Sequence, residues 1–537
     1  MPTTAYSILD DPFISVRTTD DRVQGLTLPQ ILEALAEDRV HSFDALQPHQ
    51  RKPWFSFLVQ VATIALSREG STELYQSAEK WRQALLSLSD GSTAAWCLIN
   101  DDHQQPALFQ SPIPEGSIDD AGFKADTPSP DDLDMLITSK THDIKQNRII
   151  DPDPEHWFYA LMTLQTMEGF LGVGNYGIVR MNGGFGSRPH LGIAPGLDWN
   201  SRFRRDVKVL LEHRPVVVEN YEFKPQGQAL LWLEPWDGKK AGGIPLKDCD
   251  PYFIEICRRL RFQFDDDRIV CWRNNTKATR IDAPDDLNGR TGDPWTPIDI
   301  SGDKALTLGD NGYSYELLQD IWLNNDSYEK PPALKFHDDD PGHSYLIADT
   351  LIRGQGKTKG LRHRIIPIPT KVRRLFSNSK SAREKLAKRS KYRVQLAAEV
   401  QKQVLQGPIF NLVYGGRSPS DADWSKINMW IDDFGRQVDA HFFDELWASI
   451  EADLSDEDAR IKWQKTLREL AESQYNKVRD SIPLPSIHRY RILSEADGQF
   501  WGQLKKVLPR TFQSDESNES TESTANEEHP STEPTLA

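Results

Sequence analysis

The spacing of apolar residues gives the first part of the chain a mixed character. Up to about residue 330, short β-prone runs alternate with turns rich in Asp, Gly and Pro, and Thr27 precedes a stretch whose spacing predicts a helix. A nearly continuous apolar run over 53–67 predicts a helix that is buried on most faces. The pattern therefore predicts mixed α/β structure in this part of the chain.

The last third of the chain has a different pattern, in which apolar residues recur every three or four positions. Four such stripes stand out: Leu396, Val400, Val404; then Ile427, Trp430, Phe434, Val438, Phe442, Leu446, Ile450; then Trp463, Leu467, Leu470; and finally Leu493, Phe500, Leu504, Val507. We expect breaks at Gly407-Pro408, at Gly415-Gly416, at 454–458 and at 483–485. Short links favour antiparallel neighbours, so the pattern predicts a four-helix bundle.

These two patterns predict an α+β fold in which a large mixed α/β N-terminal domain is followed by a C-terminal four-helix bundle. We place the first domain at 1–375 and the bundle at 380–510. Residues 514–537 are rich in Ser, Thr and Glu and lack aliphatic anchors before their end, so we expect a disordered acidic tail there.

Length and composition agree with a globular protein of more than one domain. The 537 residues exceed the roughly 250–300 that one core usually supports. The four cysteines form no C-x-x-C pair, which predicts neither a disulfide framework nor structural zinc. The N-terminus lacks the features of a signal peptide, and the apolar run at 54–66 is too short to cross a bilayer. We therefore expect a cytoplasmic protein without cofactors.

Charge is unevenly distributed along the chain. The whole chain carries a net charge of -16, yet residues 353–393 hold fifteen Lys or Arg and a single acid, Glu384. That window therefore carries +14 and the remainder -30. A basic stripe in an acidic protein indicates contact with a polyanion such as DNA or RNA.

The stretch GFLGVGNYGIVRMNGGFGSRP, at 169–189, combines seven glycines with two arginines and no acid. It lacks the spacing of a P-loop, and no clear strand leads into it, so a nucleotide site is not favoured. Two interpretations remain open. It is either a connection with tight turns or a loop whose bare backbone approaches a ligand, with Arg180 and Arg188 suited to a polyanion.

A second polar segment, KTHDIKQNR at 140–148, is also open to more than one interpretation. His142 and Asp143 indicate a metal-dependent phosphohydrolase or nuclease, but the sequence offers no convincing second set of ligands. Alternatively, Lys140 and Lys145 donate to phosphates while Asn147 bonds a base edge. An ordinary exposed loop is equally compatible with the sequence.

The third motif, RGQGKTKGLRHRIIPIP at 353–369, predicts a hairpin with a glycine-rich tip and an apolar returning strand. Gln355 can bond a base edge or take the place of a base, while Lys357 and Lys359 can neutralise phosphates. The simpler alternative is a solvated basic loop. We find no motif for an activated Ser or Cys nucleophile and assign no catalytic residue.

The order of these motifs resembles the large subunit, CasA, of the type I-E CRISPR surveillance complex Cascade. The resemblance covers residues 1 to about 510. It rests on SILDDPFISVR followed by LTLPQILEAL, on THDIKQN and the glycine-rich stretch, on GDPWTP at 292–297, on GQGKTKG followed by Arg362-His363, and on the helical last third.

The resemblance implies a non-catalytic subunit of a complex guided by CRISPR RNA (crRNA). Such a subunit recognises the protospacer-adjacent motif in double-stranded DNA, starts strand separation and helps recruit a helicase–nuclease in antiviral defence. Its implied partners are the DNA target, the crRNA, the backbone, handle-binding and small subunits, and the helicase–nuclease. The metal-dependent phosphohydrolase or nuclease at His142-Asp143 is the alternative, and a protein-binding scaffold is a third possibility.

The resemblance also implies a role for each motif. Gln355 would be the wedge at the tip of the hairpin, and Lys357 and Lys359 would hold the separated strands. The implied contacts with the minor groove of DNA come from Gly172, Gly174, Asn175, Tyr176 and Gly177, with Gly174, Asn175 and Tyr176 at the tip of the loop. The implied contacts with the crRNA handle and neighbouring subunits come from Lys140, His142, Lys145 and Asn147. No metal site is implied.

Overall fold

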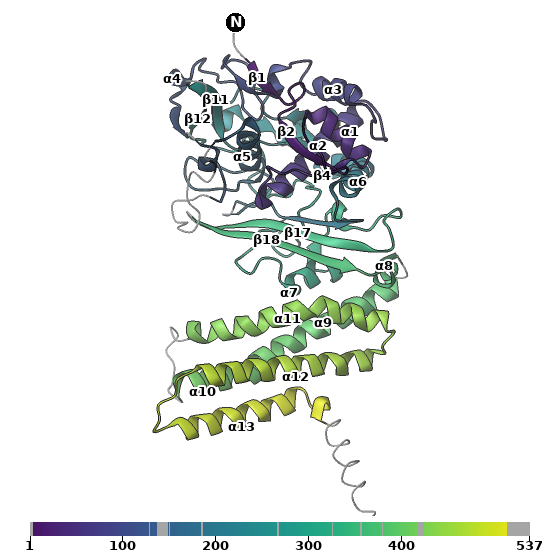
Figure 1. The fold of residues 1–537 in the computed structure, drawn as a ribbon, viewed down its shortest axis with the longest axis vertical. Helices are drawn as coiled ribbons and strands as arrows, with labels where there is room; N and C mark the ends of the chain where they lie inside the picture. Colours follow the sequence, from purple (N-terminus) through teal and green to yellow (C-terminus); the bar gives the residue numbers. More distant parts are fainter. Residues whose placement is uncertain are drawn as a thin grey trace, which may run out of the picture. The chain divides into compact units, whose positions relative to one another are not determined.

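The computed structural model divides the chain into two compact units. One, called here the N-terminal unit, comprises 1–313 and 320–368; the other, the C-terminal unit, comprises 314–319 and 369–537. The structure describes residues 4–127, 129–136, 149, 151–183, 186–265, 268–324, 326–354, 357–377, 380–415 and 424–512 (Figure 1). The first unit mixes helices and strands and the second is helical, which confirms the predicted fold class.

The core of the N-terminal unit is built around helix α2 (Arg51–Arg68), which is buried from Lys52 to Leu66 and confirms the prediction made from the apolar run. Its Gln60 amide donates to the carbonyl oxygens of Tyr252 and Phe253, 3.0 and 3.2 Å away. Helix α1 (Leu28–Ala36) begins at a capping box formed by Thr27 and Gln30. The described residues of this unit also form α3 (Ala78–Ser87), α4 (Ile118–Ala121), α5 (Pro154–Met167) and α6 (Trp199–Tyr221).

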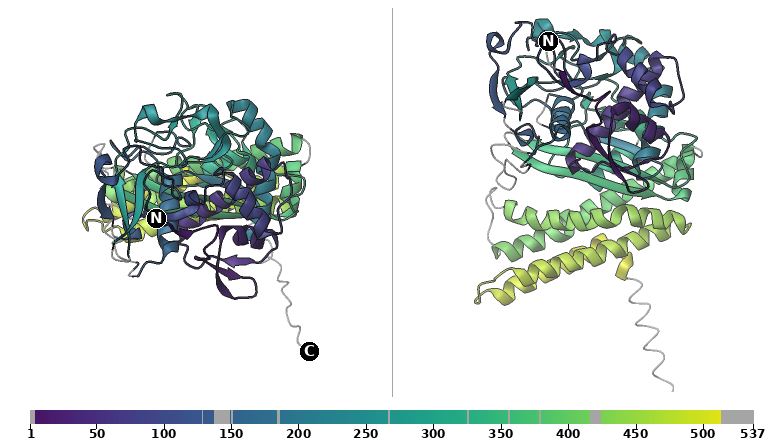
Figure 2. Two further views of the ribbon diagram at one scale, coloured as in Figure 1. Left: turned by 90° about the horizontal axis from the view of Figure 1, so that it is seen from above. Right: turned by 45° about the horizontal axis from the view of Figure 1, so that its top comes forward.

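The strands of the N-terminal unit form several small sheets around these helices (Figure 2). Sheet orders are β3-β2-β4, β1-β5, β11-β12-β6, β10-β8, β13-β9, β15-β14-β16 and β18-β17-β7. The strand bounds up to β9 are β1 Thr4–Ser7, β2 Ile14–Thr18, β3 Val23–Leu26, β4 Val40–Ser42, β5 Cys97–Asn100, β6 Lys124–Thr127, β7 His190–Ala194, β8 Gln228–Leu230 and β9 Ile244–Pro245. The later ones are β10 Cys249–Ile254, β11 Arg259–Asp265, β12 Arg268–Asn274, β13 Ile281–Asp282, β14 Ile298–Asp299, β15 Lys304–Ala305 and β16 Tyr328–Glu329.

A long hairpin forms one side of this unit. Strands β17 (Ser344–Gly354) and β18 (Lys357–Ile368) pair antiparallel from Ser344 opposite Ile368 to Gly354 opposite Lys357. On its other side β17 pairs with β7, so the base of the hairpin is fixed in a three-stranded sheet (Figure 1). The predicted hairpin with an apolar returning strand is confirmed, and residues 355 and 356 join its two strands.

Helices α5 and α6 lie where the sequence pattern predicted short strands and loops, so that prediction was wrong for both. In α6 the apolar stripe is interrupted by buried charges. Arg205 pairs with Asp340 at 2.8 Å, and Arg214 pairs with Asp250 at 2.5 Å. These arginines look exposed in the sequence, and Pro215 lies inside the helix as well. The pairs allow charged residues to occupy positions that are normally apolar.

In its described residues, the C-terminal unit contains four long helical segments. They are α9 (Lys380–Glu399) continuing through a π-helical turn (Val400–Leu405) into α10 (Gln406–Tyr414), then α11 (Ser425–Glu451), α12 (Asp456–Ser481) and α13 (Arg489–Val507). Two short helices, α7 (Tyr315–Leu318) and α8 (Thr370–Ser377), pack on α11. Six of the seven residues of the predicted stripe are buried, namely Ile427, Phe434, Val438, Phe442, Leu446 and Ile450, whereas Trp430 is half-buried.

Two details of the helical prediction were wrong. The Gly407-Pro408 pair does not end a helix. Pro408 lies in the first turn of α10, directly after the π-helical turn, where a missing N–H is tolerated. In α13 the buried stripe is Ile492, Ala496, Phe500, Leu504, so Leu493 and Val507 are only partly buried.

Three general features complete the fold. All four cysteines are buried and unpaired. No helix in the part of the chain that the structure describes is long and apolar enough to span a membrane. Residues 514–537, where the sequence predicted a disordered tail, lie outside the described residues.

Candidate nucleic-acid-binding site

The tip of the β17–β18 hairpin carries the residue to which the resemblance assigns the wedge role. Gln355 lies outside the described residues, but its place in the chain is between Gly354, the last residue of β17, and the start of β18. Two positions after Lys357, Lys359 forms an ion pair with Asp310. The Lys359 side chain is 28% exposed and that of Asp310 is 65% exposed, so a phosphate can compete with this pair.

The base of the tip is anchored by a buried ion pair. Arg353 Nη1 lies 2.5 Å from Glu168 Oε2, and the two side chains are only 3% and 2% exposed. Burial raises the pKa of Glu168, and the neighbouring Arg353 and Arg258 offset only part of that effect. Glu168 directly precedes the glycine-rich stretch, and Arg353 directly precedes the tip of the hairpin. The ion pair therefore joins the two segments that are predicted to contact DNA.

Further bonds hold the same two segments together. Glu168 and Ser187, at the two ends of the glycine-rich stretch, form a β-bridge. The Ser187 hydroxyl donates to the carbonyl oxygen of Leu351 at 2.7 Å and accepts from the Leu351 amide at 3.0 Å. Arg258 donates to the carbonyl oxygen of Tyr176. Hydrogen bonds therefore hold the end of strand β17 against the two ends of the glycine-rich stretch.

The glycine loop, residues 172–177, is a tight turn. Gly172 and Gly174 have φ angles of 108° and 86°, which favour glycine, and the Asn175 amide donates to the carbonyl oxygen of Gly172 at 2.9 Å. The exposed apex is Val173, which is 95% exposed, whereas Gly174 is buried beside Asn275. The prediction that Gly174, Asn175 and Tyr176 form the tip is therefore displaced by one residue toward the N-terminus.

Gly177 has the least room of the glycines in this loop. A Cβ atom there would lie 2.3 Å from the carbonyl carbon of Gly169 and 2.6 Å from the amide nitrogen of Phe170. Backbone atoms cannot move aside as a flexible side chain can. The position therefore requires glycine for a structural reason that is independent of any ligand.

We expect Gly177→Ala to lower the free energy of unfolding of the N-terminal unit by about 1–3 kcal/mol, because the added methyl group overlaps backbone. Gly183→Ala is the matched control. No atom lies within 4 Å of its Cβ position, and its φ is not positive, so a change within about 0.5 kcal/mol is expected. Urea unfolding of the two variants checks this. Equal stability of both would show that the loop backbone relaxes freely.

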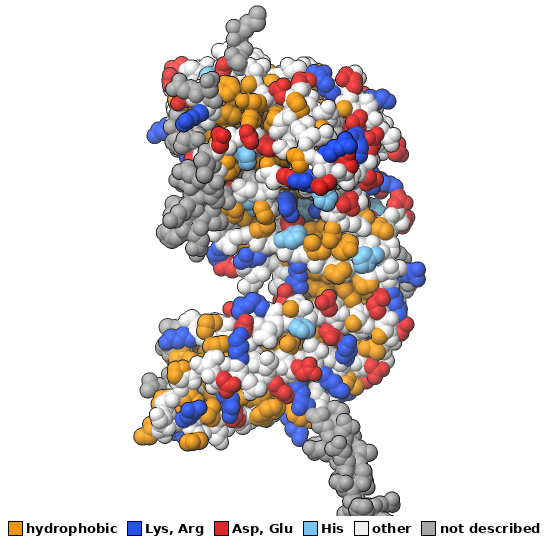
Figure 3. Space-filling view, viewed as in Figure 1, with side chains coloured by type: hydrophobic (Ala, Val, Ile, Leu, Met, Phe, Trp, Pro, Cys, Tyr) orange, Lys and Arg blue, Asp and Glu red, His pale blue; other side chains and the backbone are white. Residues whose placement is uncertain are grey.

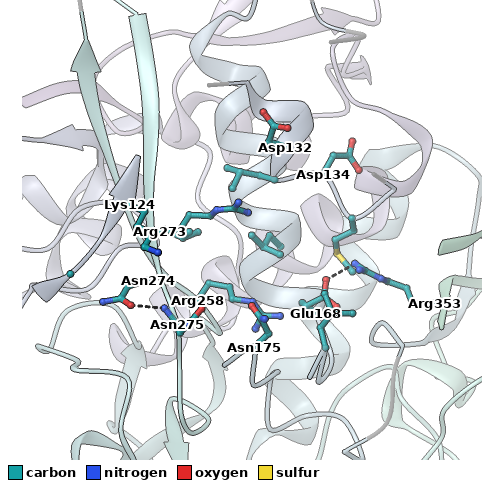
Figure 4. Close-up of a pocket in the computed structure, with 16 residues that line it drawn as sticks. Lys124, Asp132, Asp134, Glu168, Asn175, Arg258, Arg273, Asn274, Asn275 and Arg353 are labelled. Atoms are coloured by element: carbon teal, nitrogen blue, oxygen red, sulfur yellow. Dashed lines mark hydrogen bonds and ion pairs between the residues drawn. The ribbon is translucent and has the colours of Figure 1, made fainter. Parts of the chain in front are cut away.

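A cavity of about 530 Å³ lies between the glycine loop and the tip end of strand β17 (Figure 4). Its cationic side chains come from four separate segments: Lys124, Arg258, Arg273 and Arg353. Amide side chains of Asn175, Asn274 and Asn275 line it as well, and Asp132, Asp134 and Glu168 supply the acids. Guanidinium and amide donors of this kind suit phosphate and base edges.

Sequence reasoning missed most of this cavity. Arg258, Arg273 and Asn275 lie at the open end of the β11–β12 hairpin, which pairs from Arg259 opposite Asn274 to Asp265 opposite Arg268. A signal was present, because the alternating run RLRFQFDDDRIVCWRNN has the pattern of two strands around an acidic turn. What the pattern could not show is that this hairpin ends beside a loop about 100 residues earlier in the chain, where the Thr276 amide bonds the Gly174 carbonyl.

In one of the two interpretations of the glycine-rich stretch, Arg180 and Arg188 face a polyanion, and the structure contradicts that part of it. Both are buried, with exposures of 1% and 2%, and both lie beside Asp293. Arg188 Nε is 2.5 Å from Asp293 Oδ2, and Arg180 also stacks on Phe253. Burial alone would raise the pKa of Asp293, but the two arginines lower it below its ordinary value. These arginines stabilise the interior and are not accessible to DNA.

The basic window at 353–393 is divided between the two units. Its first residues lie on the hairpin of the N-terminal unit and the rest on α8 and α9 of the C-terminal unit. Two of its charges form ion pairs, Lys371 with Asp453 and Arg389 with Asp456, and a third residue, Arg393, is buried and stacks over Trp463. On the face drawn in Figure 3, basic and acidic side chains are interspersed.

The segment KTHDIKQNR lies outside the described residues, so the roles of Lys140, His142, Asp143, Lys145 and Asn147 stay predictions. Within the described parts of the chain, no group of three or more His, Cys, Asp or Glu is placed to hold a metal ion. The metal-dependent alternative therefore gains no support from the described part of the fold.

Solved structures of CRISPR-associated proteins share this fold. CasA from Thermus thermophilus matches with a TM-score of 0.61 at 15% identity, over 94% of this chain and 100% of that one. Cse1 from Thermobifida fusca matches with a TM-score of 0.64 at 13% identity, over 94% and 98%. Cse1 from Acidimicrobium ferrooxidans matches with a TM-score of 0.59 at 13% identity, over 95% and 100%.

No family model matches the chain, and no curated protein matches it in sequence. The likeness is therefore one of three-dimensional structure, and it extends over almost the whole of each chain compared. The resemblance inferred from the motifs is confirmed at this level: the chain has the CasA (Cse1) fold.

Proposed function

We propose that this chain is the large, non-catalytic subunit of a crRNA-guided type I-E Cascade complex and acts in the cytoplasm. In this role it recognises the protospacer-adjacent motif in double-stranded DNA, starts strand separation and helps recruit the helicase–nuclease. The observation that carries the proposal is the CasA fold over 94% of the chain. The hairpin whose two strands Gln355 helps to join supports it independently, because residues near the hairpin tip are bonded to the glycine-rich stretch.

The proposed mechanism starts at the glycine loop. A loop with little side-chain bulk, apart from exposed Val173, can approach the minor groove closely, and the donors of the adjacent cavity can hold the flanking phosphates. Readout in the minor groove is degenerate, because A·T and T·A present the same acceptors there. Several related motif sequences should therefore be accepted.

Strand separation follows from the position of the hairpin. Close to its tip, the hairpin is joined through Arg353 to Glu168, which precedes the glycine-rich stretch, so a duplex held at the glycine loop brings its next base pairs to Gln355. Opening costs stacking of about 1.4 kcal/mol per step, and pairing with the crRNA returns about as much. A wedge that stabilises only the first open base pairs can thus determine whether the strands separate, without nucleotide hydrolysis. Lys357 and Lys359 hold the phosphate backbones of the separated strands.

A reconstitution experiment tests the proposal. The chain is mixed with the remaining crRNA-bound subunits, and binding to duplexes with and without the motif is measured by fluorescence anisotropy. We expect the chain to co-purify with the crRNA complex and to increase affinity for motif-bearing duplex by at least about tenfold. Failure to co-purify would overturn the proposal. Duplex cleavage by the chain alone with Mg²⁺ or Mn²⁺, lost in His142→Ala, would establish the metal-dependent alternative.

A further inference from the structure

The outward face of α9 carries a concentration of positive charge. Five exposed cations, Lys380, Arg383, Lys385, Lys388 and Lys391, form what we call the α9 basic face. The one acid of this helix stretch, Glu384, lies 3.9 Å from Lys380. Among the described residues, no acidic side chain forms an ion pair with Lys388 or Lys391. The opposite face of α9 is anchored in the unit by buried Leu386 and Arg393.

Such a face is a general attractant for polyanions. Five like charges on a helix repel one another and bind anions without sequence preference, most strongly at low salt. An exposed face of this kind would hold any nucleic acid in the cell. A protein that must discriminate between sequences needs a way to weaken this background binding.

The same chain contains a segment of complementary charge. Residues 513–537 hold seven acids, Asp515, Glu516, Glu519, Glu522, Glu527, Glu528 and Glu533, and no Lys or Arg. This acidic segment follows directly on Phe512, the last described residue. Its seven negative charges outnumber the five positive charges of the α9 basic face.

The place where the described chain ends lies close to α9. The carbonyl oxygen of Thr511 accepts from Arg468 at 2.8 Å, Phe512 packs under the same guanidinium at 4.2 Å, and Arg510 pairs with Glu457. All these partners are on α12. The first turns of α12 in turn pack on α9, where Asp456 pairs with Arg389 at 2.6 Å and the Trp463 indole donates to the Arg393 carbonyl at 3.2 Å.

The distance from Phe512 to the α9 basic face is short compared with the span of a segment of this length. Positions 457 and 468 of α12 are about 17 Å apart along the helix, and the α9 basic face from 380 to 391 extends over a similar length. A flexible chain of about 25 residues has a root-mean-square span of roughly 25–30 Å, and a charged chain is more extended. The acidic segment therefore reaches the whole face at an effective concentration on the order of millimolar.

We propose that residues 513–537 occupy the α9 basic face of their own chain and exclude nucleic acids from it. The segment acts as an internal polyanion: a specific DNA that is held elsewhere on the molecule can displace it, whereas a weakly bound one cannot. Occupation of the α9 basic face by this segment concerns the isolated chain, whereas its displacement by a specific DNA rests on the proposed function.

Zero-length cross-linking tests the contact directly. A carbodiimide joins carboxylates to amines that touch, and peptide mapping of the full chain at about 50 mM salt should identify links from the acidic segment to Lys388 or Lys391. The links should be lost near 0.5 M salt, where the Debye length falls to about 4 Å. Links confined to lysines of the N-terminal unit would overturn the proposal.

Binding of a mixed-sequence, 30-nucleotide single-stranded DNA tests the consequence. A chain ending after Phe512, and a full chain with the seven acids changed to their amides, should each bind about threefold to tenfold more tightly than the natural sequence. In the background Lys388→Gln/Lys391→Gln this gain should disappear. Thermal unfolding of each variant verifies that the fold is retained.

The matched control removes two charges elsewhere. Lys224→Gln/Lys247→Gln changes two exposed lysines of the N-terminal unit, so the gain on removing the acidic segment should persist in that background. Equal DNA affinity with and without the segment would overturn the proposal. A gain that is the same in both lysine backgrounds would overturn it as well, because the segment would then act by general repulsion and not by occupying α9.

Discussion

Arg353→Gln should lower the free energy of unfolding of the N-terminal unit by about 3–5 kcal/mol. The substitution leaves Glu168 buried at 2% exposure without its guanidinium partner, and burial already raises the pKa of that carboxyl group. Uptake of a proton by Glu168 relieves only part of this cost. The measurement is equilibrium unfolding in urea, followed by tryptophan fluorescence.

Two variants make this result interpretable. Lys359→Gln breaks a more exposed pair on the neighbouring strand of the same hairpin and should cost at most about 1 kcal/mol. The double variant Arg353→Gln/Glu168→Gln replaces both charges by amides and should recover most of the stability lost by Arg353→Gln. If the double variant is instead no more stable than Arg353→Gln, the pair does not hold the two segments together.

Gln355→Ala should leave assembly intact and slow the opening of duplex DNA by at least about tenfold, which corresponds to the loss of about one stacking step of stabilisation. The paired positions of β17 and β18 end at Gly354 and Lys357, so the substituted position is not one of them. Stopped-flow fluorescence of 2-aminopurine, placed at the first base pair beside the motif, follows this step.

The control for that experiment is Gln24→Ala, which truncates an exposed glutamine of β3 and should open DNA at the natural rate. The crRNA-bound complex must retain its composition in both variants, as judged by size-exclusion chromatography. If Gln355→Ala does not change the opening rate, Gln355 is not the wedge. That result would not contradict the proposed recognition of the motif.

The sequence predicted those elements whose local pattern and burial agree. The run at 53–67 became α2, the stripe from Ile427 to Ile450 became α11, and IIPIP became the returning strand of a hairpin. Helix α6 was missed because its arginines are neutralised by Asp250 and Asp340, which are distant in sequence. The spacing of apolar residues places such charges on the surface, so it cannot predict a charged residue that is buried in an ion pair.

The candidate site was predictable only in part, for the same reason. The glycine loop and the hairpin were identified separately, but their joining through Glu168, Ser187 and Arg353 depends on contacts between segments far apart in the chain. Arg180 and Arg188 were misjudged because Asp293, more than 100 residues later, holds both in the interior. The roles that the resemblance implies for Gln355 and for the segment around His142 stay predictions.

The central claim is that this chain opens DNA at the motif on behalf of its complex. The most direct measurement is 2-aminopurine fluorescence of a motif-bearing duplex bound to the crRNA complex with and without this chain, with a scrambled motif as a third arm. The account predicts that fluorescence rises only when both the chain and the motif are present. An equal rise without the chain, or with the scrambled motif, would contradict it.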